Sequence, residues 1–464
     1  MGGVCSSDWL GVLACPRCGG RLRPLARDGD GDGCQACDGS FPLVGRIPCL
    51  VPEPALWRAL WLSRLDEHQQ VTQERIRFME EQSRAPALLA RTRARLERTI
   101  AAKVHERAVV AELFGDLRQD ALFLPSAGVP PLPENLGGRL SVLAWYENLF
   151  RDWAWGEREA AQLCRLTVEA AAIASGTGAG PPGCLAVYGA GAGRLAYDVH
   201  RAVRPARTLA FDLNPLPLLV AERVVRGETV ELDEFPVAPT TPDQVAVRQR
   251  LRAPAPTDDR LCYAFADAYQ PPLAPGAVDL ALTPWFIDIA GVDVADTAAA
   301  LARALRRGGR WVNIGPLHFN TVAARNYLFD EVLELVERGG FRLLAQGQQR
   351  LPYFDSPVSG SHREETVYWF SAEKVTEGAR PAPRGQDGPA WLDDLALPVP
   401  RTAHVADMAR TSGFTAMALS LINGQRSIRD LSAELARMSG RNPEAMVAEL
   451  RAFLAKLAGH SPQR

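Results

Sequence analysis

The feature that most constrains the fold is an alternation of short apolar runs with helical patterns between residues 184 and 372. Segments with apolar residues at three-to-four spacing separate most of these runs. Strands that alternate with helices predict an α/β fold built on a mainly parallel, doubly wound sheet. The last two runs are joined by a loop without a crossover helix, which predicts a hairpin. The predicted strands are 184–189, 208–213, 261–266, 277–287, 310–316, 341–347 and 365–372.

The remaining sequence predicts four further segments around this α/β domain, which spans 141–375. Residues 1–53 are cysteine-rich, and 54–140 carry a helical pattern rich in Arg and Glu. A Pro/Gly-rich stretch at 376–402 predicts a linker. Residues 403–464 predict a small helical module with a turn at its Asn-Gly pair and two amphipathic helices.

The charge balance excludes one class of protein. Lys and Arg number 52 against 54 Asp and Glu, a net charge of −2, which argues against a protein held on a polyanion by bulk charge. Nucleic acid is therefore not an expected partner. No run of 18 apolar residues occurs, and the N-terminus lacks a basic start followed by an apolar run. We expect no membrane span and no secretory signal, and hence a cytoplasmic location.

Four cysteines near the N-terminus have the spacing of a zinc site. Cys15, Cys18, Cys34 and Cys37 form C-x₂-C-x₁₅-C-x₂-C. Two tight turns would supply four thiolates to a closed tetrahedral structural site, without an open position for catalysis. The alternative is a pair of disulfides or free thiols. Cys49 lies in an apolar strand-like run and is expected not to bind the metal.

The segment LACPRCGGRL…CQACDGSFPLVGRIPCLVPE resembles the small zinc-ribbon partner of tRNA and rRNA methyltransferases, fused here to the chain. The resemblance covers about 45 residues. A ribbon does not name a function, since many bind protein or nucleic acid.

A glycine-rich turn follows the first strand of the α/β domain. Gly189, Gly191, Gly193 and Arg194 lead into a helix, and Asp212 ends the next strand. Glycines let a ligand approach the backbone, and the helix N-terminus offers free N–H groups. The acid is placed to accept hydrogen bonds from a ribose diol. A dinucleotide fingerprint can also be read here, so NAD stays open, as does a packed turn with a surface Asp.

The following strands favour one cofactor. Asp267 follows the third strand, where it suits an adenine amino group, and Ala268 and Pro284 are assigned to the same cofactor site. The layout matches S-adenosylmethionine-dependent methyltransferases of class I better than dehydrogenases, which need a substrate domain that the sequence lacks.

Four ordered motifs carry a closer resemblance. RDW at 151–153, VYGAGAGRLAYD at 187–198, TPWFIDIA at 283–290 and RGGRWVNIGPL at 307–317 resemble the carnosine N-methyltransferase family over roughly 141–373. The resemblance implies that Arg151 contacts the methionine carboxylate of the cofactor, with Asn148 nearby. The glycine turn and the acids at 212 and 267 would line the cofactor, and the acid at 288 would hold an imidazole.

The acceptor half departs from the family pattern. The family carries an imidazole-contacting His five residues after the Gly of GPL; here His318 stands three after Gly315, and the fifth position is Asn320. The aromatic cluster that precedes the family's last strand is replaced by a sequence that begins with His362.

The residues themselves suggest roles at the acceptor. A carboxylate that accepts the N–H of an imidazole fixes its tautomer and directs the other nitrogen to the methyl group, a role that suits Asp288. The alternative for Asp288 is a helix N-cap. His318 could bind the acceptor or cap the sheet edge, and Tyr353 and His362 are further candidates to line the acceptor pocket.

The C-terminal module resembles PqqD-like peptide-binding domains of ribosomal peptide modification pathways, chiefly in LINGQRSIRDLSAELA. A helical lid or a dimerisation element is the alternative. The hypothesis from the sequence is thus an S-adenosylmethionine-dependent N-methyltransferase that acts on an imidazole nitrogen of a small molecule or peptide. Natural-product biosynthesis is one context in which such an enzyme could act. The competing hypotheses are a methyltransferase of tRNA, rRNA or a translation factor, and a non-catalytic scaffold.

Overall fold

The computed structural model describes residues 9, 11–24, 31–37, 39–118, 141–173, 180–289, 293–319 and 323–377, with 413, 415–422, 426–440, 442, 444, 446, 447 and 450. By its internal contacts the chain divides into two units, Met1–Gly385 and Gln386–Arg464. The first unit contains the cysteine-rich segment, the helical region and the α/β domain. None of the helices described is long and apolar enough to cross a membrane.

A seven-stranded sheet forms the centre of the first unit, in the order β12-β13-β11-β10-β5-β6-β9. Only β13 runs against its neighbours. If the seven strands are numbered 1 to 7 in chain order, their order in the sheet is 6-7-5-4-1-2-3, and strand 7 is the reversed one. This is the Rossmann-like class I methyltransferase sheet that the sequence predicted. The strands are β5 (Cys184–Tyr188), β6 (Arg207–Asp212), β9 (Leu261–Phe265), β10 (Val278–Pro284), β11 (Leu305–Gly315), β12 (Phe341–Tyr353) and β13 (Arg363–Lys374).

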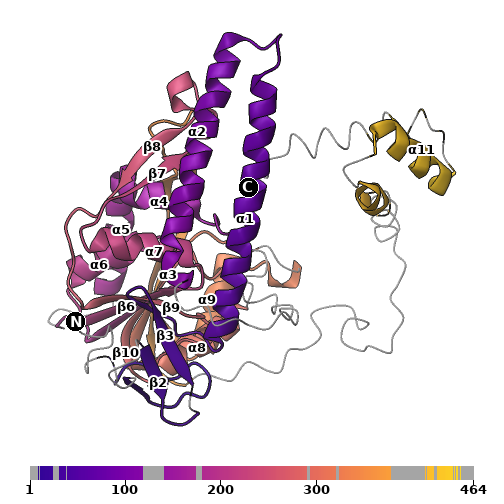
Figure 1. Ribbon diagram of the computed structural model, residues 1–464. Helices are drawn as coiled ribbons and strands as arrows, with labels where there is room; N and C mark the ends of the chain where they lie inside the picture. The colour runs from indigo at the N-terminus through magenta and orange to yellow at the C-terminus, as the bar shows by residue number, and fades with distance from the viewer. Residues whose placement is uncertain are drawn as a thin grey trace. The chain divides into compact units, whose positions relative to one another are not determined.

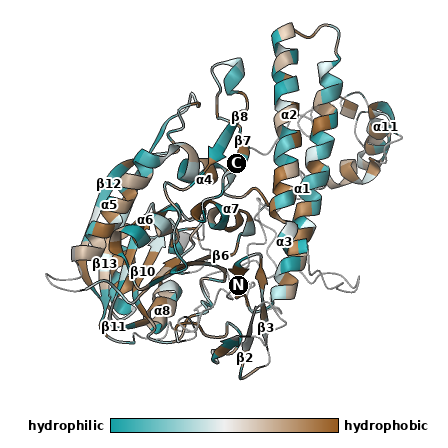
Figure 2. Cartoon of the chain, turned by 60° about the vertical axis from the view of Figure 1, so that its left-hand side comes forward, coloured by the Kyte–Doolittle hydropathy of each residue, from teal (hydrophilic) through white to brown (hydrophobic). Residues whose placement is uncertain are grey.

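Helices cover both faces of this sheet, which explains why its central strands are apolar throughout. Along β5, Leu185 and Val187 join one buried cluster, and Ala186 and Tyr188 join the other. One face carries α5 (Glu157–Ile173), α6 (Arg194–Val203) and α7 (Pro215–Val225); the other carries α8 (Val294–Ala304) and α9 (Phe329–Arg338). Helix α7 is buried along nearly its whole length and is brown in Figure 2.

The N-terminal segment is a four-stranded antiparallel ribbon joined to the edge of the central sheet. It consists of β1 (Leu22–Pro24), β2 (Gly31–Cys34), β3 (Ser40–Val44) and β4 (Ile47–Pro48). Cys49 makes a parallel bridge to Phe265 of β9, and the Leu50 N–H donates to the Phe265 carbonyl at 2.8 Å. Cys49 is therefore a core residue of the junction, as expected for a residue outside the metal motif.

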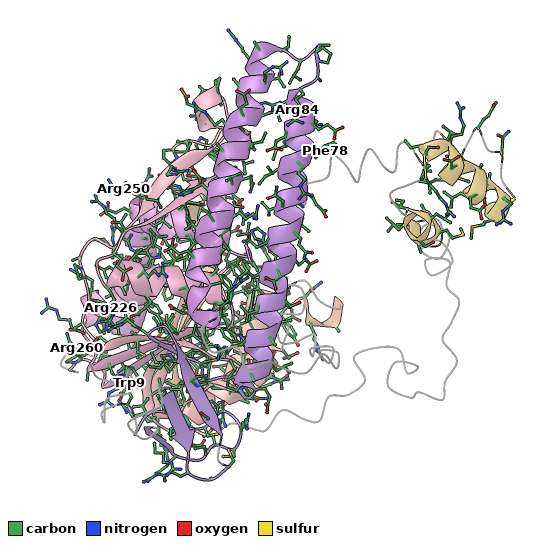
Figure 3. The ribbon with its side chains drawn as sticks, viewed as in Figure 1. Trp9, Phe78, Arg84, Arg226, Arg250 and Arg260 are labelled. Carbon is green, nitrogen blue, oxygen red and sulfur yellow. The ribbon has the colours of Figure 1, made fainter. Side chains whose placement is uncertain are left out.

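The helical region forms a long hairpin of α1 (Pro54–Ser83) and α2 (Ala90–Leu113), followed by the short α3 (Gly115–Arg118). Trp57 and Trp61 of α1 and Val110 of α2 are buried where the hairpin packs on the body. Figure 1 shows the two helices side by side. Phe78 and Arg84, labelled in Figure 3, lie toward its outer end, and both are exposed.

Two elements differ from the sequence expectation. The helical pattern that begins at Ser141 is interrupted: α4 (Tyr146–Phe150) passes into a π-helix, η2 (Arg151–Trp155), before α5 begins. An antiparallel hairpin of β7 (Val230–Glu234) and β8 (Val247–Leu251), with the 3₁₀ turn η3 (Pro242–Gln244) in its loop, was not predicted. Its strands carry charged residues at alternate positions, a period-two pattern that fits a partly exposed strand and that the sequence prediction did not use.

Strand β11 begins at Leu305, five residues before the start at 310 that the sequence predicted, and so includes the residues LRRGGR. These residues belong to β11, whose register with β10 shifts between Val278 and Leu280, and Gly308 has a φ of +73°. Gly308 and Gly309 therefore lie in an irregular, bulged beginning of strand β11. A 3₁₀ turn, η4 (Ala323–Arg325), precedes α9.

The second unit contains α11 (Ile428–Ser439), whose N-cap Ser427 accepts the Asp430 N–H. Leu431 and Leu435 of α11 pack with Ala418, Met446 and Leu450 in a small apolar cluster. The predicted Asn-Gly turn lies outside the described residues. Peptide binding by this module stays a prediction.

Candidate active site

The glycine turn lies at the carboxyl end of β5, and each of its glycines has a positive φ. The angles are +63° at Gly189, +54° at Gly191 and +83° at Gly193. A Cβ at Gly189 would lie 2.5 Å from the Phe286 ring, whereas a Cβ at Gly191 would meet nothing within 4 Å. Gly191 therefore borders open space, as a backbone cradle for a ligand requires.

Asp212 anchors this turn from the end of the adjacent strand, β6. Its Oδ2 accepts the Gly191 N–H at 2.9 Å, and its Oδ1 accepts the Asn214 N–H at 3.0 Å. Burial raises the pKa of this carboxyl group, and the backbone N–H donors oppose that shift. The indole of Trp57 donates to the Leu213 carbonyl at 3.1 Å, so the base of α1 supports the same loop.

The π-helix holds the turn from the other side. Trp153 Nε1 donates to the Ala192 carbonyl at 2.7 Å, and the Arg194 guanidinium donates to the Asp152 carbonyl at 2.7 Å and to Asp198 at 2.8 Å. We call these contacts of η2 with residues 192–194 the latch. The Arg194 guanidinium is thus engaged within the chain, so at this position the backbone rather than the side chain is available to a ligand.

Gly156 makes the π-helix possible. A Cβ there would lie 2.1 Å from the Arg151 carbonyl oxygen, which accepts the Gly156 N–H at 2.9 Å. Arg151 Nε donates to Asp152 at 2.8 Å, and its guanidinium lies 5.5 Å from the Tyr353 ring centroid. Asn148, one turn earlier on α4, is half-buried. The π-helix therefore brings Arg151 beside the aromatic wall of the site.

The second acid assigned to the cofactor site follows β9. Asp267 is buried, its Oδ1 accepts the Tyr269 N–H at 2.9 Å, and burial raises its pKa. Ala268 beside it is half-buried. The loop that follows is held by the ribbon, since the Ala14 N–H donates to the Pro272 carbonyl at 3.0 Å and the Ala274 N–H to the Val12 carbonyl at 2.8 Å.

Asp288 and His318 come together where β10 and β11 end. Asp288 is only 6% exposed. Its Oδ2 accepts the backbone N–H of His318 at 2.9 Å, whereas its Oδ1 is buried without a partner. Burial raises the pKa of Asp288. The next described helix, α8, is capped by Asp293; residues 290–292, where the segment that Asp288 would cap begins, lie outside the described residues.

Aromatic residues that the sequence did not single out line the same edge. Trp285 follows Pro284, has a φ of +47°, and stacks on Tyr353 at 5.8 Å with 8° between the rings. Its indole nitrogen is buried without a partner. Phe354 also has a positive φ, +55°. Strained backbone of this kind gathers at functional sites.

The other predicted acceptor residues fare differently. His362 lies in the β12–β13 loop, 64% exposed, with Nδ1 2.7 Å from Asp355. Asn320 lies outside the described residues. Glu365, buried on β13, has Oε1 3.3 Å from His318 Nε2, a contact that no sequence pattern indicated.

The four cysteines of the ribbon converge on one point. All their sulfur atoms lie within 4.8 Å of one another. The Cys15–Cys37 and Cys18–Cys34 Sγ distances are 3.7 and 3.5 Å, so neither pair is a disulfide. Four sulfurs bound tetrahedrally to Zn²⁺ at about 2.3 Å stand about 3.8 Å apart, so the donor set fits this ion.

Comparisons with known proteins show likeness in fold. No protein-family model matches the chain, and no curated protein matches it. Among solved structures it is similar to geranyl diphosphate C-methyltransferase from Streptomyces coelicolor (16% identity, 53% of this chain and 88% of that chain, TM-score 0.31). It is also similar to phosphoethanolamine N-methyltransferase 2 from Haemonchus contortus (14%, 50% and 56%, 0.31) and to a methyltransferase from Methanosarcina mazei (10%, 42% and 93%, 0.30). Because these identities and TM-scores are low, the comparisons do not assign a function, and we infer it from the strand order and the contacts of this chain.

Proposed function

We propose that this protein is an S-adenosylmethionine-dependent N-methyltransferase that acts on an imidazole nitrogen of a small molecule or peptide. The observation that carries the proposal is the Asp288 carboxylate, buried at the carboxyl edge of a class I sheet with one oxygen anchored and the other without a partner. A buried oxygen of this kind is a costly feature unless a ligand donates to it.

The cofactor half of the proposal rests on the glycine turn and its acids. Asp212 would accept the ribose hydroxyls, Gly191 leaves room for the ligand along the backbone, and Asp267 would accept the adenine amino group. Arg151, the first residue of η2, would meet the methionine carboxylate. The bound cofactor supplies an electrophilic sulfonium methyl group, so the chain has chiefly to align the acceptor and exclude water.

The acceptor half rests on Asp288 and the aromatic wall. An acceptor imidazole that donates its N–H to Asp288 Oδ1 presents the lone pair of its other nitrogen to the methyl group. Trp285 and Tyr353, stacked against each other, would enclose the ring and reduce the access of water. His318 is tied to Asp288 through its backbone, which fixes the two residues to each other.

The decisive experiment is methyl transfer from labelled S-adenosylmethionine to histidine-containing probes, followed by mass spectrometry. We would use β-alanyl-L-histidine, L-histidine and histidine peptides, with serine-substituted peptides as controls. Binding of S-adenosylhomocysteine is measured separately by calorimetry. Transfer to tRNA and to none of the histidine probes would replace this proposal by an RNA methyltransferase, and the absence of cofactor binding would leave a scaffold.

We further propose that the four cysteines hold a structural Zn²⁺, for which their spacing gives support. Cys15→Ser should release the metal and lower the thermal stability of the ribbon, because the polar, glycine-rich segment between the two cysteine pairs has little core of its own. Cys49→Ser is the matched control, since Cys49 lies in the ribbon but outside the cluster. Retention of one zinc per chain in Cys15→Ser would contradict the four-thiolate site.

A further inference from the structure

The β7–β8 hairpin is an insertion between strands β6 and β9 of the central sheet. In the part of the chain that the structure describes, its two strands pair only with each other. A hairpin alone is marginally stable, so this one depends on the elements around it. It lies beside α2 in Figure 1, and directly after β8 the Arg252 N–H donates to the Trp153 carbonyl of η2 at 3.1 Å. The hairpin therefore connects neighbouring elements and does not extend the sheet.

Glu234, the last residue of β7, accepts hydrogen bonds from three elements and is only 6% exposed. Its Oε2 accepts hydrogen bonds from Gln249 Nε2 of β8 at 2.7 Å and from Trp155 Nε1 of η2 at 3.2 Å. Its Oε1 accepts one at 2.7 Å from Ser356 Oγ, in the β12–β13 loop (354–362). A buried carboxylate is costly unless its oxygens are paired, and here both oxygens are. Glu234 thus joins the hairpin, η2 and the β12–β13 loop.

Two further contacts hold the β12–β13 loop to the chain that follows β7. Ser359 Oγ donates to the Val237 carbonyl at 2.6 Å, and the Gly360 N–H donates to the Ala238 carbonyl at 3.2 Å. A Cβ at Gly360 would lie 2.6 Å from that carbonyl oxygen, so a glycine permits the close approach. Together with the bond of Ser356, these contacts form what we call the clasp.

The clasp lies next to the aromatic wall of the site. Tyr353, which stacks on Trp285, ends β12, and Phe354 follows it with a φ of +55°. The guanidinium of Arg151 lies 5.4 Å from the Phe354 ring centroid. A strained backbone persists only where the surrounding contacts determine it, and Ser356, two residues further on, is bonded to the hairpin. The clasp therefore fixes the segment that carries the wall.

We propose that Glu234 is a positioning residue that, through the clasp, holds Tyr353 in the wall of the acceptor site. This inference rests on the proposed function. Glu234 acts through Ser356 and the loop, so it is not a catalytic residue. An acceptor ring that packs against a wall fixed beforehand loses less free energy to the ordering of side chains when it binds.

Hydrogen exchange of the full-length protein tests the clasp without any substrate. Ser356→Ala removes one hydrogen bond from Glu234 on the loop side and leaves the other two. We expect the Gly360 amide, followed by peptide mass spectrometry, to exchange about fivefold faster, the effect of one hydrogen bond. Ser361→Ala, at an exposed position of the same loop, is the matched control and should leave the rate unchanged. Equal rates in Ser356→Ala and the control would overturn the inference.

Substitutions of Glu234 itself separate hydrogen bonding from packing. Glu234→Leu leaves three buried donors without a partner, and we expect the Gly360 amide to exchange at least about tenfold faster. Glu234→Gln keeps an oxygen that accepts from Trp155 and Gln249, and its amide group can donate to Ser356 Oγ, so it should restore the wild-type rate. A wild-type rate in Glu234→Leu would contradict the proposal. If Glu234→Leu fails to fold, Ser356→Ala decides.

The role at the acceptor site has its own readout. With β-alanyl-L-histidine as the probe, Ser356→Ala should raise KM about fivefold relative to Ser361→Ala. The affinity for S-adenosylhomocysteine should stay within about twofold, because Ser356 has no contact with the glycine turn. An unchanged KM would refute the role of the clasp in acceptor binding. If exchange responds as expected but the wild-type protein methylates none of the histidine probes, the clasp stands, and the proposed function fails together with the role at the acceptor site.

Discussion

The proposed cofactor half and the proposed acceptor half of the site differ in how their polar groups are satisfied. In the cofactor half, the polar groups of the glycine turn, Asp212 and the latch hydrogen-bond to one another. In the acceptor half, Asp288 Oδ1 and the Trp285 indole nitrogen are buried without partners, and Trp285 and Phe354 adopt strained backbone angles. The cofactor half is therefore preorganised and holds its shape without a ligand. The buried polar atoms of the acceptor half gain a hydrogen-bond partner only when a ligand binds.

The largest effect should come from the acceptor half. Asp288→Ala removes the oxygen that would orient the imidazole, and we expect turnover of β-alanyl-L-histidine to fall at least about 100-fold. The affinity for S-adenosylhomocysteine should change by less than about twofold, because no latch contact involves Asp288. Steady-state kinetics and calorimetry measure the two quantities. Comparable losses in both would show that the halves are not separable.

The reciprocal change is in the cofactor half. Asp212→Ala removes the proposed ribose contacts and the anchor of the Gly191 N–H, and should weaken S-adenosylhomocysteine binding about 30-fold. Glu364→Ala, an exposed carboxylate elsewhere in the unit, is the control for lost charge. Calorimetry decides, and an affinity equal to that of the control would remove Asp212 from the cofactor site.

A smaller change tests the latch. Trp153→Phe deletes the indole donor to the Ala192 carbonyl but keeps an aromatic ring against Tyr197, whose centroid lies 5.7 Å away. Loss of one hydrogen bond should raise the dissociation constant of S-adenosylhomocysteine about fivefold. Trp155→Phe, which loses a bond to Glu234 instead, serves as the matched variant. Equal effects of the two would mean that the latch has no specific role.

The smallest effect is on stability and depends on pH. Burial raises the pKa of Asp288 in the folded protein, so wild type loses stability as pH rises through that folded-state pKa. Asp288→Asn has no charge to bury. We expect it to be more stable than wild type by on the order of 1 kcal/mol at neutral pH, with the gain vanishing below about pH 4. Thermal unfolding of wild type and Asp288→Asn between these pH values measures the difference in stability. A stability gain of Asp288→Asn that grows toward acid pH would show that the pKa of Asp288 is lowered, not raised.

The sequence was sufficient for the strands because their signal is local. All seven predicted runs are strands of the central sheet. The runs in β5, β9 and β10 are apolar because these strands are buried on both faces, whereas the edge strand β12 is partly exposed and only its first residues form an apolar run. The β7–β8 hairpin was missed for the converse reason: its strands are partly exposed and charged. The π-helix was missed because it interrupts a helical pattern whose periodicity continues on both sides.

The sequence alone determined which residues sit at the carboxyl edge and which cysteines meet, because both follow from chain direction and short spacing. Tertiary structure decided what those residues touch. Arg194 turns inward to Asp152, and His318 Nε2 lies 3.3 Å from Glu365 Oε1 on the reversed strand β13. Such contacts join residues far apart in the chain, and their geometry comes from strand order and packing, which no local pattern encodes.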